Sequence, residues 1–160
     1  MNISIRPIEL GDNPVMAKII RSALAEFGAD KPGTVYYDES TDHLFELFQT
    51  PGSCYFVAQD GEEILGGAGI FPTEGLPPHW CELVKMYLRR EARGLGIGRT
   101  LIAKSLEEAK KMGYKTVYLE TMPELSKAVK VYEKFGFEYL CQPMGNSGHF
   151  GCDMWMKIDL

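Results

Sequence analysis

The chain has 160 residues, of which 45% are apolar and 24% charged, a composition typical of one soluble globular domain spanning residues 1–160. A net charge of -5 disfavours general nucleic-acid binding, which needs a basic surface. No apolar run approaches the roughly 18–20 residues that span a bilayer, and residues 1–7 lack a secretory-signal pattern. The four cysteines form no C-x-x-C pair. We therefore expect free thiols, a cytoplasmic location and no membrane partner.

The first half of the chain alternates between the period of strands and the period of helices. Asn13-Pro14 has the residue types of a helix start, and Gly28 follows the last apolar position of that helix as a C-cap. Asp60-Gly61 is typical of a hairpin turn. The expected elements are a strand at 3–5, a helix at 13–27, a loop at 29–40, a short helix at 44–48, and hairpin strands at 54–59 and 64–71.

The second half predicts one strand-helix-strand crossover between residues 81 and 119. The expected strands are 81–88, 116–119, 137–141 and 150–158, and the expected helices are 97–109 and 125–135. Adjacent strands early and late in the chain indicate hairpins. The predicted fold class is therefore α/β, with a central, mostly antiparallel mixed sheet of about seven strands, one parallel crossover and helices on both faces.

The segment between the strand at 81–88 and the next helix contains three alternate glycines, Gly94, Gly96 and Gly98. Glycine lets the backbone come close to a ligand, and the N–H groups that begin a helix have no internal acceptor. Arg93 and Arg99 flank these amides. The segment therefore predicts an anion site suited to a pyrophosphate.

Two nucleotide-binding motifs can be compared with this segment. A Walker A loop would need glycine at Arg93 and lysine at Arg99. The dinucleotide fingerprint would need a small residue at Arg99 and a much shorter link from the strand. Glu120, at the end of the next strand, does imitate the ribose-binding acid of that fold, so a dinucleotide-binding protein stays open as an alternative.

Residues 93–98, Arg-Gly-Leu-Gly-Ile-Gly, match the pattern [RQ]-x-x-G-x-[GA], and residues 128–137 match A-x-x-x-Y-x-K-x-G-F. With both signatures in this order, the chain resembles the GCN5-related N-acetyltransferase (GNAT) family. The resemblance covers essentially the whole chain and is specific from about residue 80 to 138. It implies direct transfer of an acetyl group from acetyl-CoA, without a metal, to a primary amine in a ternary complex.

The resemblance also implies which residues bind acetyl-CoA. The strand at 81–88 would lend backbone groups to the pantetheine arm and thioester, and the glycine loop would hold the pyrophosphate. The implied binding residues are Met86, Tyr87, Leu88, Arg93, Gly94, Leu95, Gly96, Ile97, Gly98, Arg99 and Thr100. Many family members carry an Asn that contacts the pantetheine where this chain has Leu125, so Ser126 or the backbone would have to replace that contact.

Two residues are catalytic candidates by resemblance. Tyr132 matches the tyrosine that protonates the departing thiolate, although its place on an apolar stripe also fits a core residue. Glu82 matches a glutamate that takes the proton of the attacking amine. Two-residue periodicity would put Glu82, Val84, Met86 and Leu88 on one face, where apolar neighbours would raise the pKa of the acid. The alternatives are an ion pair of Glu82 with Lys85, or a water chain as the base.

The acceptor side is the least defined by the sequence. Tyr36, Tyr37 and Asp38 lie in the loop after the first helix and could hold an amine through cation–π and charge interactions, and His149 lies in a late loop. The three histidines have no metal-ligand spacing. We expect a small-molecule amine as acceptor, with a peptide or protein amine, or a non-catalytic CoA-binding module, as alternatives, and we also allow for a homodimer.

Overall fold

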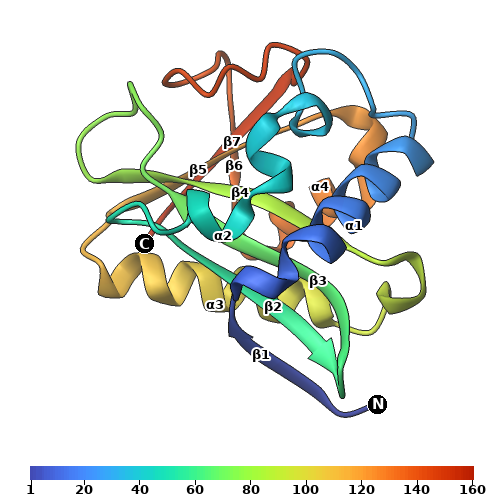
Figure 1. Cartoon of the computed structure of the whole chain (residues 1–160). Helices are drawn as coiled ribbons and strands as arrows, with labels where there is room; N and C mark the ends of the chain where they lie inside the picture. Colours follow the sequence, from blue (N-terminus) through green and yellow to red (C-terminus); the bar gives the residue numbers. More distant parts are fainter.

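The computed structural model describes residues 1–160 as one seven-stranded sheet in the order β1-β2-β3-β4-β5-β7-β6 (Figure 1). The strands are β1 (Ile3–Pro7), β2 (Cys54–Asp60), β3 (Glu63–Phe71), β4 (Trp80–Leu88), β5 (Thr116–Thr121), β6 (Glu138–Leu140) and β7 (Met154–Asp159). The helices are α1 (Asn13–Glu26), α2 (Leu44–Leu47), α3 (Ile97–Lys111) and α4 (Ser126–Phe135). None of these helices has the length and apolar character needed to cross a membrane.

Strands β1 to β4 form an antiparallel meander, and β5, β7 and β6 form a second antiparallel group. The two groups meet at the parallel pair β4–β5, which α3 connects. This confirms the predicted mixed sheet with one crossover. A single parallel pair is not the parallel sheet of a dinucleotide-binding fold, so that alternative is wrong. Helices α1 and α2 cover one face of the sheet, and α3 and α4 cover the other (Figure 1).

Each face of the sheet has its own apolar core. On the α1 side, Met16, Ile20 and Leu24 pack with residues of β2 and β3. On the other side, Ile102 of α3 and Tyr132 of α4 pack in a cluster with β4 and β5. The helical stripes read from the sequence therefore face the sheet as expected.

Two element ends differ from the expectation in more than one or two residues or in how they are capped. Asn13 is the first residue of α1 and not its N-cap, and its side chain bonds to α2: its Oδ1 accepts from the amide of Phe45 and its Nδ2 donates to Glu46, both at 2.8 Å. Strand β7 begins at Met154 and not at residue 150. The reason is that the amide of Gly151 donates to the carbonyl of Gly33 at 2.8 Å, which ties this segment to the loop after α1 and away from the sheet.

A β-bulge in β4 corrects the predicted alternation of that strand. Lys85 has φ of 53°, and the register between β3 and β4 shifts there: Gly67 pairs with Tyr87, whereas Gly69 pairs with Val84. Strand β4 therefore has one extra residue between these two pairs. The hydroxyl of Tyr55 donates to the carbonyl of Lys85 at 2.6 Å, which supports this conformation. Because of the extra residue, Met86 packs with the clusters under α3 and α4, whereas Val84 packs on the α1 side. The expectation that Glu82, Val84, Met86 and Leu88 share one face is therefore wrong.

Strands β4 and β5 pair at only three positions, which end with Glu82 opposite Tyr118. Beyond these positions β4 continues to Leu88 alongside β3, and β5 continues to Thr121 alongside β7. The two strands therefore separate toward their carboxyl ends, and backbone edges on both sides of the gap lack a strand partner.

Candidate active site

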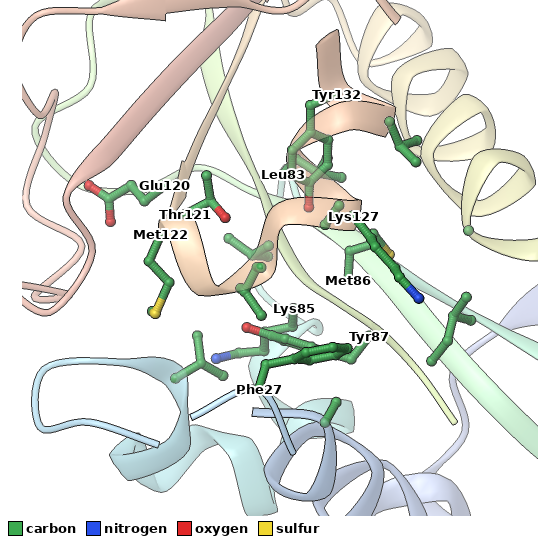
Figure 2. Close-up of a pocket in the computed structure, with 18 of the residues that line it drawn as sticks. Phe27, Leu83, Lys85, Met86, Tyr87, Glu120, Thr121, Met122, Lys127 and Tyr132 are labelled. Carbon is green, nitrogen blue, oxygen red and sulfur yellow. The ribbon is translucent and has the colours of Figure 1, made fainter. Parts of the chain in front are cut away.

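A cavity of about 490 Å³ occupies the gap between β4 and β5 (Figure 2). At one end it reaches the glycine loop at the start of α3, where Gly94, Gly96, Gly98 and Arg99 line it. At the other end it reaches Glu82, Glu120 and His149. Its sides come from β4, from the segment that leads into α4, and from the end of α1. One continuous cavity therefore joins the predicted anion site to the predicted base.

The glycine loop presents a run of free backbone amides. None of the six amides from Gly94 to Arg99 donates to a backbone carbonyl, whereas those of Arg93 and Thr100 do. Gly94 and Gly96 have φ of 77° and 82°, a conformation that favours glycine. With these amides at the positive end of the α3 dipole, the loop can bind an anion, as the sequence predicts.

The other residues of the predicted loop differ in how they are placed. The side chain of Ile97 is buried in the core, and that of Leu95 is exposed. The hydroxyl of Thr100 donates to the carbonyl of Gly96. None of these three residues lines the cavity. Arg99 is exposed and lines it.

Arg93 also lines the cavity but is already engaged with α1. Its guanidinium lies 2.8 Å from the carboxylate of Glu26 and 4.8 Å from the centre of the Phe27 ring. It also donates to the carbonyl of Leu88 at 3.2 Å. Arg99 is therefore the less committed of the two predicted cations.

Tyr132 belongs to both the core and the cavity. Its ring packs edge-on against Phe137, with ring centres 5.7 Å apart, and burial raises the pKa of its hydroxyl. Figure 2 shows the hydroxyl directed from α4 into the cavity, toward the side where Met86 lies. The side chain is thus a buried, protonated hydroxyl within reach of a bound molecule.

Glu82 is a buried acid without a cation in direct contact. It is 3% exposed, and its Oε1 accepts a hydrogen bond of 2.7 Å from Thr73. Burial, together with the negative charge of Glu120, raises the pKa of Glu82 to about 7, and the charges of His149 and Lys85 partly oppose this. The ion pair with Lys85, the alternative to the base role, does not form, because Lys85 pairs with another acid. Glu82 is therefore poised to exchange a proton near neutral pH.

Glu120 lies beside Glu82 and stays ionised. Burial opposes its charge, but contacts with His149, Ser147 and Tyr118 outweigh burial and lower its pKa. The Tyr118 hydroxyl donates to it at 2.7 Å, Ser147 donates a second hydrogen bond, and Nδ1 of His149 lies 3.7 Å away. Glu120 thus keeps a fixed negative charge next to the candidate base.

His149 connects Glu120 to the loop after α1. Its Nε2 lies 2.6 Å from Oδ2 of Asp38, and the same oxygen is 3.4 Å from Nζ of Lys85. Burial disfavours the imidazolium, but the bonds to Asp38 and Glu120 outweigh burial and raise the pKa of His149 to about 9. At neutral pH these four side chains therefore form a chain of alternating charges.

The predicted acceptor residues thus divide into two groups. Asp38 and His149 meet beside the cavity, although 111 positions separate them in the sequence. Tyr36 and Tyr37 do not line it: Tyr36 packs on the α1-side core and Tyr37 is exposed. Sequence reasoning considered Lys85 only as a possible ion-pair partner of Glu82, and Glu120 only as a ribose-binding acid. The available signal was the expected parallel pairing of β4 and β5, which places the end of β5 near Glu82.

Ligand atoms of Glu82, Glu120 and His149 lie within 4.8 Å of one another, a grouping that the sequence spacing did not reveal. These residue types can bind metal ions, but a histidine ligand must be neutral. His149 has a raised pKa of about 9 and is already bonded to Asp38. The cluster is therefore better suited to holding charge and protons than to holding a cation.

We predict that Glu82 makes folding stability fall as the pH rises through the window from 4.5 to about 7. The folded protein keeps a proton on Glu82 in this window, whereas the unfolded chain releases it, so the unfolding free energy decreases with pH. Between pH 5 and pH 8 the unfolding free energy of the wild type should fall by about 2–3 kcal/mol more than that of Glu82→Gln. Urea unfolding at both pH values measures this difference. Glu62→Gln, at an exposed turn, is the matched control and should behave as the wild type does. Equal losses of unfolding free energy in the wild type and in Glu82→Gln would show that the pKa of Glu82 is not raised by folding.

Three comparisons relate this architecture to known proteins. The model described as "Acetyltransferase (GNAT) family" matches residues 18–137. The Escherichia coli K12 protein called "Uncharacterized N-acetyltransferase YjgM" is 39% identical over 158 residues, which cover 98% of this chain and 94% of that protein. A GNAT-family acetyltransferase structure from Staphylococcus aureus Mu50 has a TM-score of 0.87 at 18% identity, over 99% of both chains. The PaiA N-acetyltransferase of Thermoplasma acidophilum, in complex with coenzyme A, has a TM-score of 0.78 at 19% identity, over 100% of both. The chain belongs to the GNAT family of N-acetyltransferases.

Proposed function

We propose that the chain transfers an acetyl group from acetyl-CoA directly to the primary amine of a small molecule. The observation that carries this proposal is the continuity of one cavity from six free amides, residues 94–99, to the buried acid Glu82. When bound, the donor supplies an acetyl thioester, which is activated for attack by an amine. The protein has to bind the donor, orient it and manage two protons.

The donor would bind along the gap between β4 and β5. The amides of the glycine loop, with Arg99 beside them, fit the pyrophosphate in charge and hydrogen-bonding capacity. The unpaired edge of β4 at Met86, Tyr87 and Leu88 offers backbone groups to the amides of the pantetheine arm. Arg93 would contribute only by sharing its guanidinium with Glu26.

Proton transfer would use two of the buried side chains that line the cavity, Glu82 and Tyr132. Glu82 would take the proton of the attacking amine, directly or through one water, since its pKa of about 7 suits a general base at neutral pH. Tyr132 would give its proton to the departing sulfur, because its raised pKa keeps the hydroxyl protonated.

The enclosure of the Glu82 end favours a small acceptor. Two loops meet there, joined by the Gly151–Gly33 backbone hydrogen bond and the His149–Asp38 contact. A flat protein surface could not reach a side chain that is 3% exposed without moving these loops. A peptide with an extended amino terminus stays the second candidate. Release of free thiol from acetyl-CoA, measured with a panel of small amines and peptides, decides between the two acceptor classes. If no acceptor in the panel causes thiol release, the proposal is contradicted.

The anion site is tested by Gly98→Asp. Gly98 lies among the free amides, its φ is not positive, and a Cβ there meets nothing closer than 3.4 Å. A carboxylate at this position should repel the pyrophosphate and weaken CoA binding at least about tenfold, which corresponds to 1.4 kcal/mol. Calorimetry measures the affinity, and Gly98→Ala, without the charge, should show a much smaller loss. If a folded Gly98→Asp variant bound CoA with wild-type affinity, the glycine loop would not be part of the donor site.

The base is tested by the pH dependence of Glu82→Gln. In the wild type, kcat/KM should fall below about pH 7 as Glu82 becomes protonated, in addition to any titration of the amine itself. The variant should be slower, should lack this limb, and should recover at high pH, where free amine is more abundant. Profiles of the same shape for both proteins would instead favour a water chain.

The acid is tested by Tyr132→Phe, which keeps the ring and its packing on Phe137. A proton donor acts in the transition state, so kcat should fall about ten- to a hundredfold while CoA affinity changes little. Steady-state kinetics and calorimetry on the same preparation separate the two quantities. Full turnover in a folded variant would make Tyr132 a core residue only.

A further inference from the structure

Thr121 has the one buried side-chain oxygen or nitrogen in the chain without a hydrogen-bond partner, its Oγ1. The residue is 3% exposed, ends β5 and lines the cavity. A buried hydroxyl without a partner costs roughly 1–3 kcal/mol, so folded proteins contain few of them. An unpaired hydroxyl beside a cavity points to a partner that arrives with a ligand.

The architecture explains why no protein group reaches this hydroxyl. Strand β5 has already separated from β4, with which its last paired residue is Tyr118. From α4 and the segment before it, Leu125, Ala128 and Val131 line the cavity with side chains that have no polar atoms. The polar side chains of α4 that also line it, Lys127 and Tyr132, form no hydrogen bond with Thr121.

Thr121 lies on the donor side of the cavity and not in the acidic cluster, and its Oγ1, which is closed to solvent in this structure, has to turn about the Cα–Cβ bond to meet a ligand. Side chains alternate along β5, so Thr121 shares a face with Val117 and Leu119, which pack in the same cluster as Tyr132. Glu120 projects to the opposite side, and Figure 2 shows its carboxylate and the Thr121 oxygen turned away from each other. A neutral hydroxyl in an apolar wall suits a neutral amide better than a charged amine.

We propose that Thr121 binds the pantetheine arm of the acyl donor through a hydrogen bond between its Oγ1 and an amide of the arm. A hydroxyl both donates and accepts, so it can pair with the N–H or the C=O of such an amide. The proposal rests on the function proposed above and adds a donor-binding residue that neither sequence signature contains. It also supplies a side-chain contact on the β5 side, where Leu125 offers none.

Thr121→Val keeps the shape of the side chain and removes the hydroxyl. Its affinity for CoA should fall about three- to tenfold, the range of one hydrogen bond. Its affinity for 3′-phosphoadenosine 5′-diphosphate, the nucleotide half of CoA, should not change. The melting temperature without ligand should stay equal or rise, because no hydrogen bond is lost. Thr121→Ser should bind CoA nearly as the wild type does.

Thr116→Val is the matched control on the same strand. The hydroxyl of Thr116 already donates to Asp159 at 2.9 Å and does not line the cavity. This variant should therefore lose stability and keep its CoA affinity, the opposite of Thr121→Val. Calorimetry of the wild type and of the three variants, Thr121→Val, Thr121→Ser and Thr116→Val, gives the affinities for CoA and for its nucleotide half. Thermal unfolding of the same four proteins gives the melting temperatures.

The outcomes separate this inference from the proposed function. If the wild type binds CoA and Thr121→Val binds it equally well, the inference is wrong and the proposed function stands. If Thr121→Val weakens CoA and the nucleotide half by the same factor, the hydroxyl does not contact the arm and the inference is again wrong. If the wild type does not bind CoA at all, both fail.

Discussion

The separation of β4 from β5 beyond Glu82 is the constraint on which the rest of the site depends. Three paired positions hold the two halves of the sheet together, and each strand then follows its antiparallel neighbour. An open gap in a sheet normally exposes unpaired backbone groups, an arrangement that is costly without a partner. Here the gap leads directly to the amino terminus of α3, so backbone groups without partners at the strand edges and at the helix start border the same cavity.

The bulge at Lys85 determines which side chains face which part of this cavity. Without the extra residue, Met86 and Leu88 would share the face of Glu82. With it, they turn toward α3, while Lys85 turns toward the loop after α1 and reaches Asp38. Positive φ at a buried lysine is an uncommon, strained conformation, and the hydrogen bond from Tyr55 helps to hold it. The structure thus keeps apolar strand residues beside the helix start and charged ones at the opposite end.

The sequence could predict what local patterns encode. Helical stripes, the hairpin turn at Asp60-Gly61 and the two signature motifs placed nearly every element and the glycine loop correctly. Alternation along β4 does not reveal the bulge, and the hydrogen bond that supports it is long-range: Tyr55 on β2 donates to the Lys85 carbonyl. The pairing of His149 with Asp38 depends on two loops that meet only in the folded chain. An unpaired hydroxyl such as that of Thr121 is a property of its surroundings, and no motif marks it.

The charges around Glu82 explain how the pKa of this acid can lie near 7 while its carboxylate can still act as a base. Lys85, Asp38, His149 and Glu120 alternate in sign along one chain of contacts, so each cation already contacts an acid other than Glu82. Had Lys85 paired with Glu82, the carboxylate would have been stabilised and would be a poor base. Because the cations are engaged elsewhere and Glu120 stays negative, a proton on Glu82 is favoured until about pH 7. A positively charged amine that enters the cavity would reverse this balance, since it favours the carboxylate to which it can then give its proton.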